Sequence, residues 1–155
     1  MSTPPPFADL LPFLQGVPIF GGVPDAHLET LWRHADWLTF EADDVLVREG
    51  EPARALYVVV EGAIVVRKGE TTLSALGPGD CVGEMALIDI QPRSADLVAM
   101  TDVKVMALGI ADLLRLQTSS LETYAIVVLN LARELSRRLR LANRALVAAG
   151  LPTVE

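Results

Sequence analysis

Residues 77–95 read G-P-G-D-C-V-G-E-M-A-L-I-D-I-Q-P-R-S-A, and this stretch combines three features that an anionic sugar ligand requires. Gly83 has no Cβ, which permits a close backbone approach and unusual φ angles. Residues 84–88 are long enough for one or two helical turns, whose first N–H groups would point at an anion. Arg93 follows Glu84 by nine residues, and its guanidinium fork suits a phosphate while the carboxylate suits sugar hydroxyls. The stretch therefore predicts a binding site for a phosphorylated sugar.

Short segments in which apolar residues recur with a period of two lie on both sides of this stretch. They are rich in β-branched residues and are separated by turns that contain Gly, Asp or Glu. The expected strands are residues 37–40, 45–48, 56–60, 63–67, 71–76, 95–99 and 104–108. Strands of this length and spacing predict a small antiparallel barrel or jelly roll.

Helical periodicity precedes and follows the predicted barrel. The expected helices are residues 7–15, 25–36, 110–116 and 120–148. The last of them carries one apolar stripe at helical spacing, made of Leu121, Tyr124, Val128, Leu131, Leu135, Leu139, Ala142 and Leu146. The fold class is therefore α+β and mainly β: an antiparallel β-roll (a jelly-roll-like barrel) with N-terminal helices, a short helix within 77–95 and a long C-terminal helix.

A chain of 155 residues is long enough for one domain with its own core. The proline-rich start predicts a flexible segment at residues 1–12. The domain itself is expected at 13–149, with the β-roll at about 37–109 and the C-terminal helices at 110–148.

Charge and composition exclude several classes of protein. The net charge is −7 and the pI is near 4.8, which is the wrong sign for a nucleic-acid surface that covers the fold. Cys81 is the single cysteine, so the chain forms no internal disulfide. No apolar run reaches the length of a membrane span, and the N-terminus lacks the basic start and apolar run of a secretion signal. A cytoplasmic location is the prediction.

The sequence contains no recognisable catalytic or metal-binding constellation. His27 and His34 are seven residues apart on one predicted helix, whereas a metal pair would need a spacing of three or four. Cys81 has no histidine near it in sequence and is expected to be a small buried side chain. A metal-dependent β-barrel enzyme would need a cluster of His and Glu ligands. The prediction is that the chain is not an enzyme.

Residues 77–95 resemble the phosphate-binding cassette of the cyclic nucleotide-binding domain family. This family includes catabolite-activator-type regulators, kinase regulatory subunits and cyclic nucleotide-gated channels. The matching segments are 83–87 and 92–95, with weaker support from 48–51, 56–62 and 77–80. The resemblance extends over residues 13–148 and implies a stand-alone domain of the bacterial type with this fold.

The resemblance implies a set of ligand-binding residues in the cassette, by which we mean residues 83–95. Arg93 would bind the cyclic phosphate, with Gly83 and the backbone N–H groups of Met85 and Ala86 around it. Glu84 would accept a hydrogen bond from the ribose 2′-hydroxyl. A cyclic nucleotide, cAMP or cGMP, is thus the expected ligand, and no cofactor or metal is expected.

The residues that would contact the base are less determined. Val66 occupies the place of the strand residue that packs on the purine in the family, although plain barrel core fits Val66 almost as well. Ser94 would add a hydroxyl donor or would only satisfy the local turn. Tyr124, Val128 or Asn130 of the long helix would cover the base. Members that prefer cGMP often have Thr directly after the arginine, so Ser94 discriminates weakly; cAMP is favoured and cGMP stays open.

The resemblance implies a regulatory module that signals by repositioning its long helix. The sequence holds no helix-turn-helix or other output module, so we expect an effector in trans or a longer protein of which this chain is one module. The arginines at 133–144 suit an acidic partner, nucleic acid or simply a solvated helix face, and a homodimer through this helix is a further expectation. The alternative is an interaction protein that keeps the fold without binding nucleotide.

Overall fold

The computed structural model describes residues 2–83 and 92–154. Its helices in chain order are α1 (Phe7–Gln15), the 3₁₀ helix η1 (Pro18–Phe20), α2 (Asp25–His34), α3 (Ile110–Ser119) and α4 (Leu121–Ala148). Its strands are β1 (Asp36–Phe40), β2 (Val45–Val47), β3 (Ala55–Glu61), β4 (Ile64–Lys68), β5 (Thr71–Leu76), β6 (Cys81–Val82), β7 (Asp96–Ala99) and β8 (Val103–Gly109).

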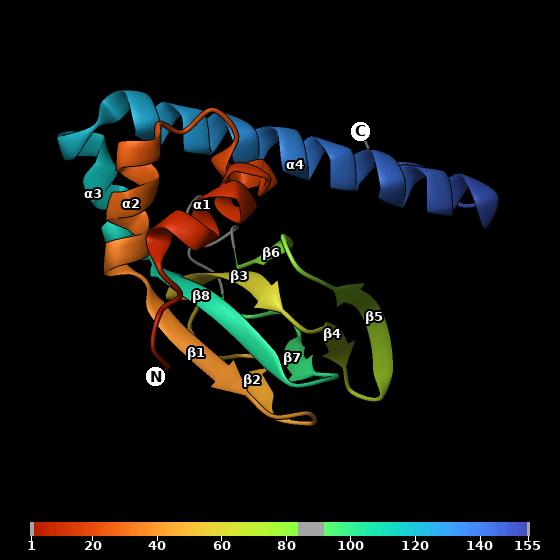
Figure 1. Cartoon of the computed structure of the whole chain (residues 1–155). Coiled ribbons are helices and arrows are strands. Elements are labelled where there is room, and N and C mark those ends of the chain that lie inside the picture. The colour runs from red at the N-terminus through yellow and green to blue at the C-terminus, as the bar shows by residue number, and fades with distance from the viewer. Residues whose placement is uncertain (1, 84–91, 155) are drawn as a thin grey trace.

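The strands form two four-stranded sheets in which every pairing is antiparallel. Their orders are β1-β8-β3-β6 and β2-β7-β4-β5. The helices gather on one side of the β-roll, and α4 crosses above them and continues past β6 (Figure 1). The predicted fold class, a β-roll with N-terminal helices and a long C-terminal helix, is confirmed. The short helix expected inside the cassette lies outside the described residues.

The element boundaries differ from the sequence-based ones mostly by one to three residues. The helix expected at 25–36 ends at His34, because Asp36 already pairs with Ala107 in the sheet. Strand β6 was not predicted, since a strand of two residues shows no periodicity. It pairs with β3 through Tyr57 and Val82, and it brings the start of the cassette beside β3.

Both faces of the first sheet are buried, which explains why β3 and β8 read as nearly continuous apolar runs. Leu56 and Val58 of β3 face the helices and belong to the larger core cluster. Tyr57 and Val59 alternate with them and face the interior of the β-roll. The first sheet is therefore shared between a helical layer and the barrel core.

The first half of α4 is fixed to the helical layer. Asn130 is only 8% exposed, and its side-chain amide donates to the carbonyl oxygens of Ile19 (3.1 Å) and Gly21 (2.7 Å). The side chain of Thr123, which is also buried, is hydrogen-bonded to Nδ1 of His27 on α2. Asn130 is one of the three residues that the sequence offers as a cover for the base, and in the structure its amide group holds η1.

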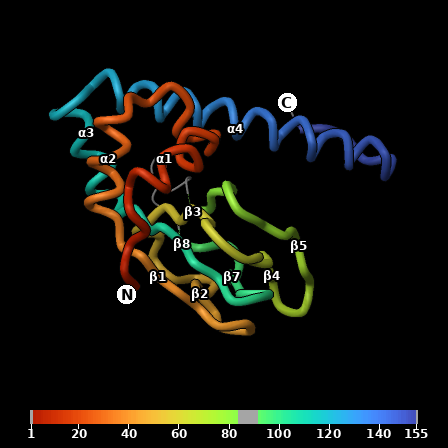
Figure 2. Tube along the Cα trace, viewed as in Figure 1, coloured from red at the N-terminus to blue at the C-terminus, as the bar shows by residue number. Residues whose placement is uncertain are grey.

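The N-terminal residues lie against the domain. The backbone N–H of Ser2 donates to the carbonyl of Trp37 (2.7 Å), and the indole N–H of Trp32 donates to that of Pro5 (3.0 Å). Figure 2 shows this segment running beside β1. The boundary expected at residue 12 falls inside α1, whose Leu10 is buried in the core.

We expect Asn130→Ala to lower the free energy of unfolding by about 2–3 kcal/mol, because it leaves two carbonyl groups without their buried donor. Urea denaturation measures the change. Asn143→Ala is the matched control: its side chain bonds to Val154 at the surface, and we expect a change within about 0.5 kcal/mol. Equal losses in the two variants would contradict the role given to Asn130.

Candidate functional site

Gly83 lies where only a glycine fits. Its φ is +89°, a value that side-chain-bearing residues rarely adopt. A Cβ at this position would lie 2.6 Å from the carbonyl oxygen of Ala55, and closer still to Nη1 of Arg93. The backbone of Gly83 is therefore packed directly against the guanidinium group that the sequence predicted as a phosphate ligand.

The side chain of Arg93 is half-buried and has defined contacts. Nη2 donates to the carbonyl oxygen of Ala55 at 2.7 Å. The guanidinium carbon lies 5.6 Å from the centroid of the Tyr57 ring, which is the geometry of a cation–π contact. These two contacts fix the position of the charge before any ligand binds, which lowers the entropy that binding would cost.

The backbone of Arg93 is fixed by the turn at residues 48–51. The N–H of Arg93 donates to the carbonyl of Glu51 (2.9 Å), and the N–H of Gly50 donates to the carbonyl of Arg93 (2.8 Å). Pro52 and Pro92 form an isolated antiparallel bridge beside them. The turn, which supported the resemblance only weakly, thus has a direct structural connection to the site.

The structure brings together some of the predicted site residues. Gly83 and Arg93 are in contact, and Ser94 next to them is exposed. Val66 on β4 is half-buried and packs against the barrel core, as Tyr57 does. Three other predicted residues lie outside the described part of the chain: Glu84, Met85 and Ala86.

Ala55 and Tyr57 were not predicted as site residues. Ala55 contributes through its carbonyl group, which no side-chain pattern reveals. A signal for Tyr57 exists in the alternation along β3, which directs it into the β-roll while Leu56 and Val58 face the helices. That alternation does not show that the Arg93 side chain packs on the Tyr57 ring.

The arrangement suits the binding of an anion rather than catalysis. A guanidinium group carries five N–H donors, so Arg93 can bind a phosphate oxygen while it donates to Ala55. Among the described residues, no group of three or more His, Cys, Asp or Glu side chains is placed to hold a metal ion.

No helix among the residues that the structure describes is long and apolar enough to cross a membrane.

We expect Gly83→Ala to lower the free energy of unfolding by about 2–5 kcal/mol, since the strain of a positive φ adds to the overlap with Arg93 and Ala55. Gly79→Ala is the control: its φ is +90°, but nothing lies within 4 Å of the added Cβ, so only the backbone strain of about 1–2 kcal/mol applies. Urea denaturation compares the two, and equal losses would mean that Gly83 is not closely packed.

Known proteins of similar sequence and structure are regulators and channels. A cyclic AMP receptor protein from Thermus thermophilus is 32% identical over 135 residues, which cover 84% of this chain and 61% of the relative. A cyclic nucleotide-gated potassium channel from Mesorhizobium japonicum is 40% identical over 106 residues, which cover 68% of this chain and 29% of the channel. The chain thus spans less than two thirds of the length of these relatives.

A solved cyclic nucleotide-binding domain from Methylobacillus flagellatus has the same fold, with a TM-score of 0.81 at 24% identity, over 96% of this chain and 86% of that one. Residues 37–120, more than half of the chain, match the family model of the cyclic nucleotide-binding domain. The matched region includes both sheets, the cassette and α3. The chain belongs to the cyclic nucleotide-binding domain family.

Proposed function

We propose that this chain is a regulatory module that binds a cyclic nucleotide, with cAMP preferred over cGMP. The observation that supports it most directly is the contact between Arg93 and Gly83, which fixes a guanidinium group at the start of the cassette. The preference for cAMP rests on relatives that are named for cAMP, because Ser94 after Arg93 discriminates only weakly. Family membership supports a ligand-binding rather than a catalytic role.

The proposed ligand lies with its cyclic phosphate on Arg93. Two N–H···O bonds from one guanidinium give both strength and orientation, and each charged hydrogen bond contributes about 1.5–3 kcal/mol. The backbone N–H groups of Met85 and Ala86 complete the phosphate site in this proposal. Glu84 accepts from the ribose 2′-hydroxyl, and Ser94 adds a donor beside Arg93.

The base is proposed to lie against Val66, with α4 as its cover. Val66 and Tyr57 pack on the same barrel cluster, which places an apolar wall near the guanidinium of Arg93. The amide of Asn130 is occupied by Ile19 and Gly21, so a base contact from α4 has to come from another residue.

Signalling is proposed to follow from a shift between two positions of α4. A ligand shifts such an equilibrium only through its different affinities for the two states. The effector that responds to the position of α4 would act in trans or belong to a longer protein. The relatives are longer than the region that this chain matches. The cytoplasmic location stays a prediction.

A homodimer through α4 is proposed from the second half of its apolar stripe, whose spacings of four, three and four follow the heptad pattern of a coiled coil. These residues are Leu135, Leu139, Ala142 and Leu146. Small and large side chains mix along it, and a small side chain lets two helices approach closely. Leu139 of this stripe is 44% exposed.

Isothermal titration with cAMP and with cGMP tests the binding function. We expect Arg93→Ala to weaken binding by about tenfold to more than a hundredfold, because it removes the phosphate anchor. Arg48→Ala is the control, since Arg48 lies in the turn that holds the backbone of Arg93 but its side chain is exposed, and the affinity of this variant should match that of the parent. Circular dichroism verifies that both variants are folded.

Two results would overturn the proposal. If the parent chain binds neither nucleotide, the chain is an interaction protein with the same fold. If Arg93→Ala binds as tightly as the parent, the phosphate lies elsewhere.

For the dimer, we expect Leu139→Glu to shift the mass measured by sedimentation equilibrium from dimer to monomer, because it places charges in the apolar seam. Val147→Glu provides the control: Val147 is 64% exposed and follows Leu146 in the helix, but it is not part of the stripe. A parent chain that is monomeric at all concentrations would refute the dimer.

A further inference from the structure

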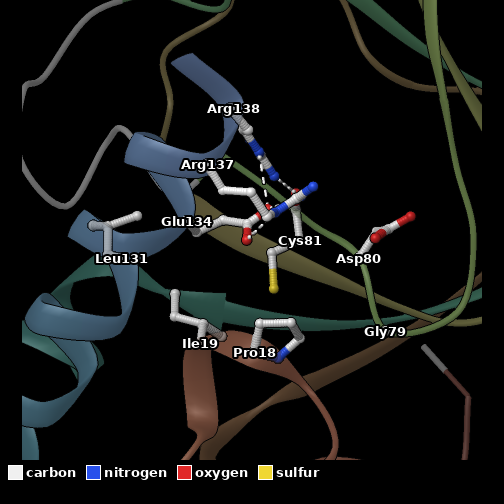
Figure 3. A pocket seen from close by; sticks show the side chains of 9 residues that line it. All are labelled: Pro18, Ile19, Gly79, Asp80, Cys81, Leu131, Glu134, Arg137 and Arg138. Atoms are coloured by element: carbon white, nitrogen blue, oxygen red, sulfur yellow. Dashed lines mark hydrogen bonds and ion pairs between the residues drawn. The ribbon is translucent and has the colours of Figure 1, made fainter. Parts of the chain in front are cut away.

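The second half of α4 meets the β-roll through polar contacts. The fully buried residues of this helix are Thr123, Val127, Asn130 and Leu131, all in its first half. Beyond Leu131 the helix runs past β6, and a pocket of about 100 Å³ lies between α4, η1 and the loop before β6 (Figure 3). Leu135 is half-buried and packs on the helical core cluster, and polar contacts across the pocket add to the position of this half of α4.

One of these contacts joins α4 to the strand that leads into the cassette. Nη2 of Arg138 donates to the carbonyl oxygen of Cys81 at 3.0 Å, and Nε of the same side chain lies 3.3 Å from Oε1 of Glu134. Strand β6 is the last strand of its sheet within residues 2–83 and 92–154, so in this part of the chain no strand pairs with its outer edge. Arg138 supplies a donor to this edge where another strand would otherwise do so.

Glu134 is itself fixed by a second arginine. Arg137 donates to its two carboxylate oxygens at 2.5 and 3.0 Å. The hydrogen bond from Arg137 is the main cause that lowers the pKa of the Glu134 carboxyl, so Glu134 is ionised at neutral pH. The Glu134 side chain is 17% exposed, which limits the screening of its attraction to Arg138. Figure 3 shows both arginines extending from α4 toward this carboxylate.

We propose that Glu134 and Arg138 form a clamp that fixes the second half of α4 against β6 and thereby positions Gly83, two residues after Cys81, for the ligand. Gly83 is packed directly on Arg93, so a displacement of β6 changes the backbone against which the guanidinium rests. Arg138 is a positioning residue that acts through Cys81 and Gly83. The link to the ligand rests on the proposed cyclic nucleotide binding, whereas the position of α4 does not.

The distance between α4 and the β-roll tests the clamp without any ligand. Spin labels are attached to Leu73→Cys on β5 and Val147→Cys on α4, both at exposed positions, in a chain that also carries Cys81→Ala. The Cys81 change leaves its carbonyl group in place. In pulsed electron paramagnetic resonance, we expect one narrow distance distribution for this parent and a broadened or longer one after Arg138→Met, which keeps the unbranched stem but removes the donors.

Two further variants separate the clamp from a general effect on the helix. Arg140→Met is the matched control, because Arg140 is exposed and its guanidinium donates to Ser136 of its own helix. It should leave the distribution unchanged. Arg138→Lys retains one charged donor and should restore part of the narrow component. An unchanged distribution in Arg138→Met overturns the clamp, and so does an equal change in Arg140→Met.

The affinity for cAMP tests the second half of the proposal. We expect Arg138→Met to raise the dissociation constant about tenfold and Arg140→Met to leave it within about twofold. If the distances change but the affinity does not, the clamp positions α4 and has no role in binding. If the parent binds neither cAMP nor cGMP, the proposed function fails, and the distance measurement still decides whether the clamp exists.

Discussion

The close approach between the guanidinium of Arg93 and the backbone of Gly83 imposes several conditions on this fold. It requires a glycine at 83, a positive φ there and the carbonyl of Ala55 in reach of the same side chain. Those conditions hold only if β6 pairs with β3, since this pairing brings the start of the cassette beside Ala55. The turn at 48–51 then fixes the backbone of Arg93 from the other side.

The first sheet connects this site to the helices. Alternate residues of β3 enter the helical core and the barrel core, so a change in the position of the strand affects both layers. Tyr57 is on the barrel side under Arg93, and its neighbours Leu56 and Val58 are on the helical side. A dense interior transmits such small displacements because it contains few voids that would absorb them.

Helix α4 is attached differently along its length. Its buried residues all lie in its first half, which holds η1 through Asn130, whereas its second half is exposed or half-buried and contacts β6 through Arg138. Several of the arginines that suggested an acidic partner have contacts within the helix itself: Arg137 with Glu134, and Arg140 with Ser136. Much of the basic run is therefore accounted for by the helix and its junction with the β-roll.

The sequence by itself determined the fold class and the long helix, and it singled out Gly83 and Arg93, which the structure brings into contact. These follow from local periods, from turn residues and from a motif within 77–95, all of which are visible in short windows. Only the tertiary structure decided that Asn130 holds η1, that Tyr57 and Ala55 support Arg93 and that Arg138 bonds to β6. Each of these contacts joins residues that are distant in sequence, and every hydrogen-bond acceptor among them is a backbone carbonyl group, whose position no residue type encodes. The register of the strands and the docking of the helices place those groups, and both result from the packing of the whole chain.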